Sequence, residues 1–204
     1  MIEAEINGIF PVPIYRAKLK RKFTPQELRL VEEMKAQCVV NAGNITTKDN
    51  YILNHPSLIT LKKEMDLFIE DYFSKILSPP KTVIPYITQS WLNYTEPKES
   101  HHKHNHANSY ISGVLYINAN KAHDKITFSH NRYDQIKLSN TKWNFFNSET
   151  WFFPVESGDV IMFPSRLTHE VKPTEGKDIR ISLSFNVFVK GNLGIMSDLT
   201  ELKR

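Results

Sequence analysis

Four of the eight histidines of this 204-residue chain lie within six positions, in the segment HHKHNH at residues 101–106. His104 and His106 are two residues apart, so on an extended strand their side chains point to the same face. A third histidine, His169, stands later in the chain among small and polar residues. Neutral imidazole nitrogen binds iron, zinc, copper and nickel. We therefore expect His104, His106 and His169 to hold a metal ion between two distant segments.

Arg180, eleven positions after His169, is predicted to bind a carboxylate. The segment Ile179–Phe185 alternates between apolar residues and the polar residues Arg180, Ser182 and Ser184, which is the pattern of a β-strand with two different faces. In a jelly roll, one of these faces points into the barrel. A buried arginine needs an anion, and its guanidinium matches a carboxylate with two parallel hydrogen bonds. Arg180, with Ser182 beside it, is thus the expected anchor.

The longer segments around these residues carry a resemblance to a known family. The runs HNHANSYISGVLYIN, SGDVIMFPSRLTHEVKP and RISLSFN, together with IFPVPIY and the SWLN at residues 90–93, resemble the iron(II)/2-oxoglutarate-dependent oxygenases of bacteria and bacteriophages. The resemblance covers about residues 9–190. It implies a double-stranded β-helix (a cupin-like jelly roll) and the cofactors Fe(II), 2-oxoglutarate and O2. By position, it implies that His104 and His169 bind iron and that Arg180 binds 2-oxoglutarate.

The histidine pair departs from the pattern of the wider oxygenase superfamily. There, a His-x-Asp or His-x-Glu pair and a distal histidine bind the iron, whereas this chain reads His104-Asn105-His106. Either His106 replaces the carboxylate and gives a site of three imidazoles, or the carboxylate position is empty or filled from elsewhere. No catalytic residue beyond the metal ligands is predicted.

The expected reaction is hydroxylation of an unidentified substrate with release of succinate and CO2. The substrate class stays open among small molecules, protein side chains and nucleobases. The aromatic-rich segment 143–153 is expected to line the entrance to the site. Polar residues expected to face the lumen and to help hold 2-oxoglutarate or the substrate are Asn93, Tyr116, Ser182 and Asn186.

Three other functions compete with this interpretation. A three-histidine cupin-type metal enzyme would not use 2-oxoglutarate, but cupins usually add a glutamate soon after the His-x-His pair, and residues 107–113 contain none. A non-enzymatic jelly-roll binding module would carry the histidines incidentally and would retain no stoichiometric iron. A zinc hydrolase would need a general base near the histidines, and none is evident.

Short strands must position these residues. A run of short strands separated by turn signals predicts a mainly β sandwich or barrel. We also expect polar loops at residues 41–50 and 96–102. Besides Ile179–Phe185, the predicted strands are one or two edge strands within residues 1–19, Thr82–Tyr94, Tyr110–Asn118, Lys125–Ser129, Gln135–Leu138, Trp151–Val155 and Val160–Phe163.

Two helices are predicted in the N-terminal half, packed outside the sheet. Thr24-Pro25-Gln26-Glu27 is a capping box with proline at the first helical position, and helical spacing continues to about residue 37. The second helix covers about residues 56–77 and ends before Pro79-Pro80. Its apolar stripe consists of Leu58, Leu61, Met65, Phe68, Tyr72 and Ile76.

Length and composition indicate one domain over residues 1–204, with N-terminal strands and helices at 1–80, a jelly-roll core at 81–190 and a C-terminal tail at 191–204. The net charge of +4 permits an anionic partner but does not indicate nucleic acid. One cysteine, Cys38, and no signal peptide favour the cytoplasm of a bacterial cell, or of the host if the chain is phage-encoded. No apolar run is long enough for a membrane span, and the oligomeric state is not indicated.

Overall fold

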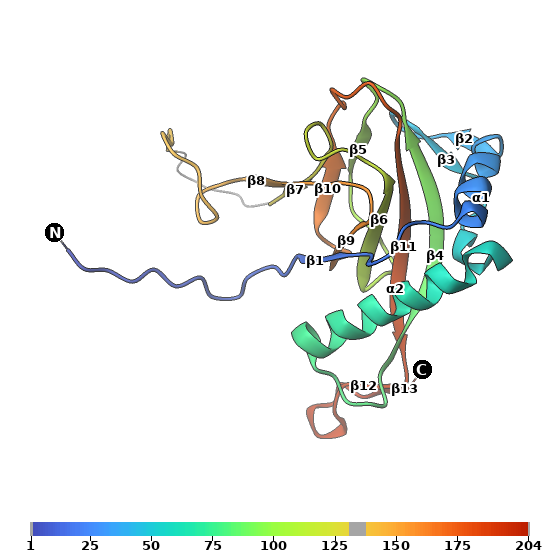
Figure 1. Ribbon diagram of the computed structural model, residues 1–204. Coiled ribbons are helices and arrows are strands. Elements are labelled where there is room, and N and C mark those ends of the chain that lie inside the picture. Colours follow the sequence, from blue (N-terminus) through green and yellow to red (C-terminus); the bar gives the residue numbers. More distant parts are fainter. Residues whose placement is uncertain (1, 131–137, 204) are drawn as a thin grey trace.

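Two antiparallel sheets face each other in this computed structural model, which describes residues 2–130 and 138–203 (Figure 1). The strands of the large sheet, in spatial order, are β1 (Tyr15–Lys18), β9 (Asp159–Pro164), β6 (Ile111–Asn118), β11 (Arg180–Lys190), β4 (Ile84–Thr95), β3 (Ile45–Thr47) and β2 (Cys38–Val40). Those of the small sheet are β5 (His101–His104), β10 (Thr168–Val171), β7 (Lys125–Ser129) and β8 (Thr150–Pro154). This mainly β architecture agrees with the predicted fold class.

Both predicted helices are present. Helix α1 (Pro25–Lys35) begins at the expected capping box, in which Thr24 accepts from the backbone N–H of Glu27 and the Glu27 carboxylate accepts from that of Thr24. Helix α2 (Ile59–Tyr72) follows the short turns η1 (Ile52–Asn54) and η2 (Pro56–Leu58), and it continues into the π-helical turn η3 (Phe73–Leu77). The predicted second helix thus corresponds to one helical run.

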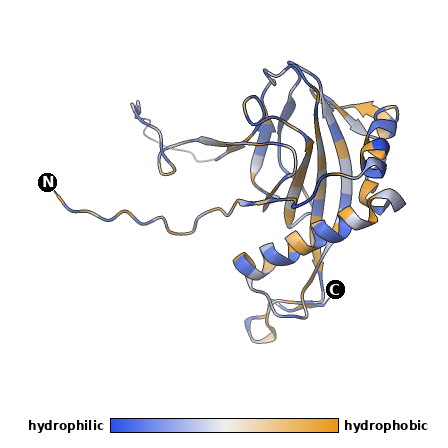
Figure 2. Cartoon of the chain, viewed as in Figure 1, coloured by the Kyte–Doolittle hydropathy of each residue, from blue (hydrophilic) through white to orange (hydrophobic). Residues whose placement is uncertain are grey.

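The main hydrophobic core lies between these helices and the outer face of the large sheet (Figures 1 and 2). Met65 and Ile69 of α2 belong to the same buried cluster as Leu183 and Phe185 of β11. Gly113 on the neighbouring strand β6 is required there, because a Cβ at this position would lie 2.1 Å from the Phe185 ring. The helices therefore hold β11 in place from behind.

The other face of β11 points toward the small sheet, as its alternation predicted. Arg180, Ser182 and Ser184 line a cavity between the sheets. A second, smaller buried cluster fills the rest of this space, with members from both sheets: Val114, Tyr116, Ile126, Phe128, Val155, Ile161 and Phe163. The sheets thus enclose one polar and one apolar region side by side.

Several elements differ from the prediction. The region expected to be a helix end and a polar loop forms the hairpin β2–β3, and β3 pairs with β4. Strand β5 begins at His101, inside the predicted loop 96–102. Residues 191–204 include the two-stranded pair β12 (Asn192–Leu193) and β13 (Leu202–Lys203), with the short turn η4 (Met196–Asp198) between them. The predicted strand Gln135–Leu138 lies almost wholly outside the described residues.

Two segments extend away from the body on the same side: residues 2–14 before β1, and residues 138–149 before β8 (Figure 1). An added Cβ at Gly8 would lie 3.5 Å from the Phe146 ring, so these segments approach each other. In the described part of the chain, each helix is too short or too polar to cross a membrane.

Candidate metal centre

Three histidines converge between the two sheets. His104 ends β5, His106 follows in the next loop, and His169 lies on β10, where it is the direct Cα partner of His104. One ligand nitrogen from each ring lies within 4.8 Å of the other two. The side chains predicted from spacing alone are therefore brought together, in a group that contains no aspartate or glutamate from the described residues.

The hydrogen bonds made by Nδ1 show which nitrogen of His104 and His169 is left for a metal ion. The Nδ1 atoms of His104 and His169 lie 2.7 and 3.0 Å from the carbonyl oxygens of His102 and Leu167. Carbonyl oxygens only accept, so both Nδ1 atoms carry the proton and both Nε2 atoms keep a lone pair. Such outer hydrogen bonds fix the ring orientation of a metal ligand.

The ring of His106 is held by a side chain instead of a carbonyl group of the backbone. Its Nδ1 lies 2.6 Å from Oδ1 of Asn186, and its backbone N–H donates to the carbonyl of Ser165. Ser112 also donates to Asn186 Oδ1, at 2.9 Å, and its hydroxyl lies 2.8 Å from that of Ser165. These bonds leave Nε2 of His106 free, 3.1 Å from Nε2 of His104. Nε2 is thus the nitrogen that each of the three rings keeps for a metal ion.

The surroundings keep these imidazoles neutral. Burial, together with neighbouring histidines, lowers the pKa of His104 to about 4 and that of His169 to about 3, although the backbone hydrogen bond of each ring opposes the shift. Burial also lowers the pKa of His106, although its hydrogen bond to Asn186 opposes the shift. Because a metal ion binds the neutral imidazole, the site is in its ligand form at pH 7.

Arg180 lies in the same cavity and forms no ion pair with a carboxylate of the described residues. Its side chain is 3% exposed, and neither Nε nor Nη1 has a hydrogen-bond partner within the described residues. Its guanidinium carbon lies 5.7 Å from the ring centroid of Tyr116. Burial lowers its pKa, which Tyr116 and Asp124 oppose. An unpaired buried guanidinium is costly, so the arrangement fits an exogenous carboxylate.

The other residues predicted to hold 2-oxoglutarate fall into two places. Asn93, Ser182 and Tyr116 are Cα partners across β4, β11 and β6, so they form one row beside Arg180. The amide nitrogen of Asn93 donates to Ser184, while its Oδ1 has no partner among the described residues. Asn186 lies further along β11, where it supports His106. A direct contact of Asn186 with 2-oxoglutarate stays a prediction.

His101 is a site residue that the sequence did not reveal. It was expected in an exposed loop, but it lies on β5, lines the cavity with Arg180, and stacks on His104 at 4.7 Å. The amide of Asn41, in the β2–β3 hairpin, lies 3.2 Å from its Nε2. Burial and its neighbours, including His104 and Arg180, lower the pKa of His101 to about 2.

Comparison with known proteins agrees with this geometry. Residues 89–186 match the family described as "Putative 2OG-Fe(II) oxygenase". This segment contains the three histidines and Arg180. The match confirms the expected resemblance over residues 89–186 and, with it, the enzyme class and the cofactors Fe(II), 2-oxoglutarate and O2. No curated protein matches the chain.

Solved structures share the fold. An oxidoreductase of the 2OG-Fe(II) oxygenase family from Burkholderia pseudomallei is 15% identical over 84% of this chain and 83% of that chain, with a TM-score of 0.55. A prolyl-4-hydroxylase from Pseudomonas putida is 14% identical over 86% and 92%, with a TM-score of 0.55. The epimerase SnoN, solved with Fe3+, alpha ketoglutarate and nogalamycin RO, is 13% identical over 91% and 84%, with a TM-score of 0.65. These similarities confirm the predicted jelly roll.

Proposed function

We propose that this chain, whose residues 89–186 belong to the 2OG-Fe(II) oxygenase family, hydroxylates a C–H bond of its substrate. In this reaction one oxygen atom of O2 enters the new hydroxyl group, the other enters succinate, and 2-oxoglutarate loses CO2. Iron(II) and 2-oxoglutarate supply the oxidising chemistry when they are bound. The whole chain, residues 1–204, acts as one oxygenase domain in this proposal.

His104, His106 and His169 hold the iron through Nε2 in this assignment. Their Nδ1 protons bind His102 O, Asn186 and Leu167 O, and these bonds keep each ring in the required tautomer. Three neutral imidazoles add no negative charge to the centre. A site with a carboxylate ligand would, in contrast, add one negative charge to the centre.

Arg180 binds the distal carboxylate of 2-oxoglutarate in this assignment, with Ser182, Asn93 and Tyr116 beside it. The guanidinium of Arg180, whose Nε and Nη1 have no hydrogen-bond partner among the described residues, supplies donors that suit a carboxylate. This buried guanidinium, placed in one cavity with three converging imidazoles, is the observation that carries the proposal. A binding module without a carboxylate ligand would have no use for it.

An anaerobic titration tests the proposal. Purified metal-free chain is loaded with one equivalent of Fe(II) and titrated with 2-oxoglutarate, with visible absorption and calorimetry as readouts. We expect saturable binding of one 2-oxoglutarate per iron, and release of succinate after O2 is admitted. Retention of iron without 2-oxoglutarate binding at millimolar concentration would instead support a three-histidine enzyme of another kind. Failure to retain iron would refute the metal assignment.

A further inference from the structure

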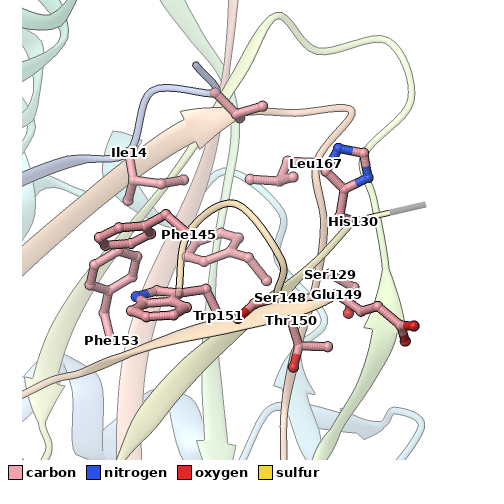
Figure 3. Close-up of a pocket in the computed structure, with 12 residues that line it drawn as sticks. Ile14, Ser129, His130, Phe145, Ser148, Glu149, Thr150, Trp151, Phe153 and Leu167 are labelled. Atoms are coloured by element: carbon pink, nitrogen blue, oxygen red, sulfur yellow. The ribbon is translucent and has the colours of Figure 1, made fainter. Parts of the chain in front are cut away.

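A second cavity opens beside the metal centre, between the segment before β1 and the start of β8 (Figure 3). We call it the aromatic pocket and define it by Ile14, Phe128, Phe145, Trp151, Phe153 and Leu167. Its volume is about 340 Å³, which lies at the small end of the range for ligand sites. The predicted entrance segment contributes Phe145, Trp151 and Phe153, whereas Trp143 does not line the pocket.

The aromatic pocket shares its wall with the metal centre. Phe128 is the Cα partner of His169, and the two ring centroids are 6.3 Å apart. Leu167, on the same wall, accepts the hydrogen bond from Nδ1 of His169. Phe163 lies in contact with both Phe128 and His169, at 5.0 and 4.7 Å. A group seated in this pocket would therefore lie next to a proposed iron ligand.

The lining selects against anions. It contains no lysine or arginine from the described residues, although the chain as a whole carries a net charge of +4. Arg16 contacts Phe153 but does not line the pocket. An anion placed against the rings would lose water without a lysine or arginine of the described residues as counter-charge. Stacked rings, with Phe145 and Trp151 at 4.2 Å, instead offer a surface for flat or aliphatic groups.

The polar side chains that line the aromatic pocket lie at one end of it (Figure 3). Figure 3 shows Ile14, Phe145, Trp151 and Phe153 gathered on one side, with Glu149 on the other side and its carboxylate directed away from the rings. An occupant would thus meet an apolar wall over most of its surface and hydrogen-bonding groups at one edge.

We propose that the aromatic pocket anchors an uncharged, ring-sized apolar group of a small-molecule substrate, next to the place of oxidation. This inference rests on the proposed function, because it concerns the substrate of that reaction. It narrows the substrate class, because the described lining offers no lysine or arginine to pair with the phosphate of a nucleotide. It also assigns a binding role to Trp151 and Phe153.

Two matched fluorescent probes test the pocket. N-phenyl-1-naphthylamine is uncharged, and 8-anilinonaphthalene-1-sulfonate has the same rings with one negative charge. The metal-free chain should bind the neutral probe more tightly than the sulfonate, by roughly tenfold or more, since a desolvated charge without a partner is disfavoured. Equal affinities, or tighter binding of the sulfonate, would overturn the proposal.

Variants locate the probe. Trp151→Ala should weaken binding of the neutral probe by roughly tenfold. Trp143→Ala is the matched control, because Trp143 lies in the same segment, is exposed and does not line the pocket; it should bind as the wild type does. Thermal melting checks that each variant folds. If Trp151→Ala does not fold, Phe145→Ala replaces it, since Phe145 lines the pocket with 74% of its surface exposed. An unchanged affinity in the folded lining variant would overturn the assignment.

A metal ion tests the position of the pocket. Co(II) bound to the histidines should quench the fluorescence of the bound neutral probe in the wild type, and this quenching should be absent in His169→Ala. No quenching in a wild type that binds both Co(II) and the probe would place the pocket away from the site. Loss of probe binding at high protein concentration, together with dimer formation, would assign the pocket to a second copy of the chain.

These outcomes separate the two proposals. If the neutral probe does not bind but 2-oxoglutarate does, the aromatic pocket alone is wrongly assigned. If the probe binds but the iron-loaded chain takes up no 2-oxoglutarate, the proposed function fails while the apolar site stands.

Discussion

His106 and Asn186 are joined by a 2.6 Å contact between Nδ1 and Oδ1. An amide oxygen only accepts, so this contact requires the proton on Nδ1 and leaves Nε2 of His106 available to a metal ion. His106 stands in the position where the superfamily commonly has a carboxylate. Its ring is therefore held in the tautomer of a metal ligand. Since no carboxylate of the described residues joins the group, we assign the third position to His106.

The first prediction concerns this assignment. His106→Ala should lose most of its iron affinity, because one of three ligands is removed, whereas His106→Asp should retain part of it by supplying a carboxylate oxygen. Asn186→Ala should weaken iron binding by about 10- to 100-fold, since outer partners of ligating histidines have effects of this size. Iron affinity is measured by competition with a chelator. Equal affinity in His106→Ala and wild type would exclude His106 as a ligand.

The second prediction concerns the two histidines paired across β5 and β10. His104→Ala and His169→Ala should each abolish iron retention after desalting, because two imidazoles alone make a weak site. His123→Ala is the control, since His123 is exposed and lies outside the group, and it should retain iron as the wild type does. Elemental analysis gives the iron content. Full retention in either ligand variant would remove that residue from the site.

The third prediction concerns the carboxylate anchor. Arg180→Gln should weaken 2-oxoglutarate binding by roughly 30-fold or more, because a bidentate pair in a desolvated site is broken. Arg180→Lys should restore only part of the affinity, since an ammonium group lacks the planar pair of donors. Iron binding should persist in both variants. Arg166→Gln, at an exposed position, is the control in the same calorimetric titration, and unchanged affinity in Arg180→Gln would refute the role of this arginine.

The fourth prediction concerns pH. The pKa values of His101, His104 and His169 are lowered to about 2, 4 and 3, below the ordinary value of 6.5. Below pH 6.5 the unfolded chain therefore binds protons that the folded chain does not, and the metal-free protein loses stability as the pH falls from 7 toward 4. Each such proton contributes a slope of up to about 1.4 kcal/mol per pH unit.

Chemical denaturation of the metal-free protein at pH 7 and pH 5 measures this slope. His101→Gln should reduce this slope by the contribution of about one proton, because the variant has no group to titrate at position 101. His123→Gln should leave it unchanged. Identical slopes in wild type and His101→Gln would mean that the folded chain protonates His101 as readily as the unfolded chain does.

The fifth prediction concerns the scaffold. Arg21 pairs with Glu27 and Glu64, each at 2.7 Å. Burial opposes the charge of Glu27, but Arg21 and Thr24 outweigh it and lower its pKa. Glu27→Gln should reduce the free energy of unfolding by about 1–3 kcal/mol at pH 7, because a buried charge-assisted contact is lost. The exposed Glu32→Gln should change it by less than about 0.5 kcal/mol, and equal melting of the two variants would contradict the prediction.

Much of this arrangement follows from local patterns in the sequence. The strand Ile179–Phe185 and the helix at Thr24–Glu27 were predictable because alternation and capping chemistry act over a few residues. The convergence of His104, His106 and His169 was expected from residue type and from the family resemblance. These signals do not depend on knowing how distant segments pack.

The missed features depend on contacts far apart in the chain. Strands β2 and β3 are three residues each and mostly polar or exposed, so neither their hairpin nor the pairing of β3 with β4 has a periodic signal. His101 is enclosed because Asn41 reaches it from that hairpin, 60 positions away. Its register also departs from a regular ladder: His104 pairs with His169 but His101 pairs with Val171. A pattern read along one strand cannot reveal an irregular pairing with another.

The pairing of β11 with β4 has a consequence for how the enzyme matures. Asn93 and Ser184 bond across this pair although 91 positions separate them, and Arg180 lies on the same strand. Contacts of such long sequence separation form late in folding, after the entropy of closing a large loop has been overcome. The ring of His106 is held by Asn186 on β11, so the third proposed ligand gains its geometry only when β11 is in place. We expect a folding intermediate that lacks β11 to capture iron poorly, so that oxygen-reactive metal enters the protein only when the cavity that confines its chemistry already exists.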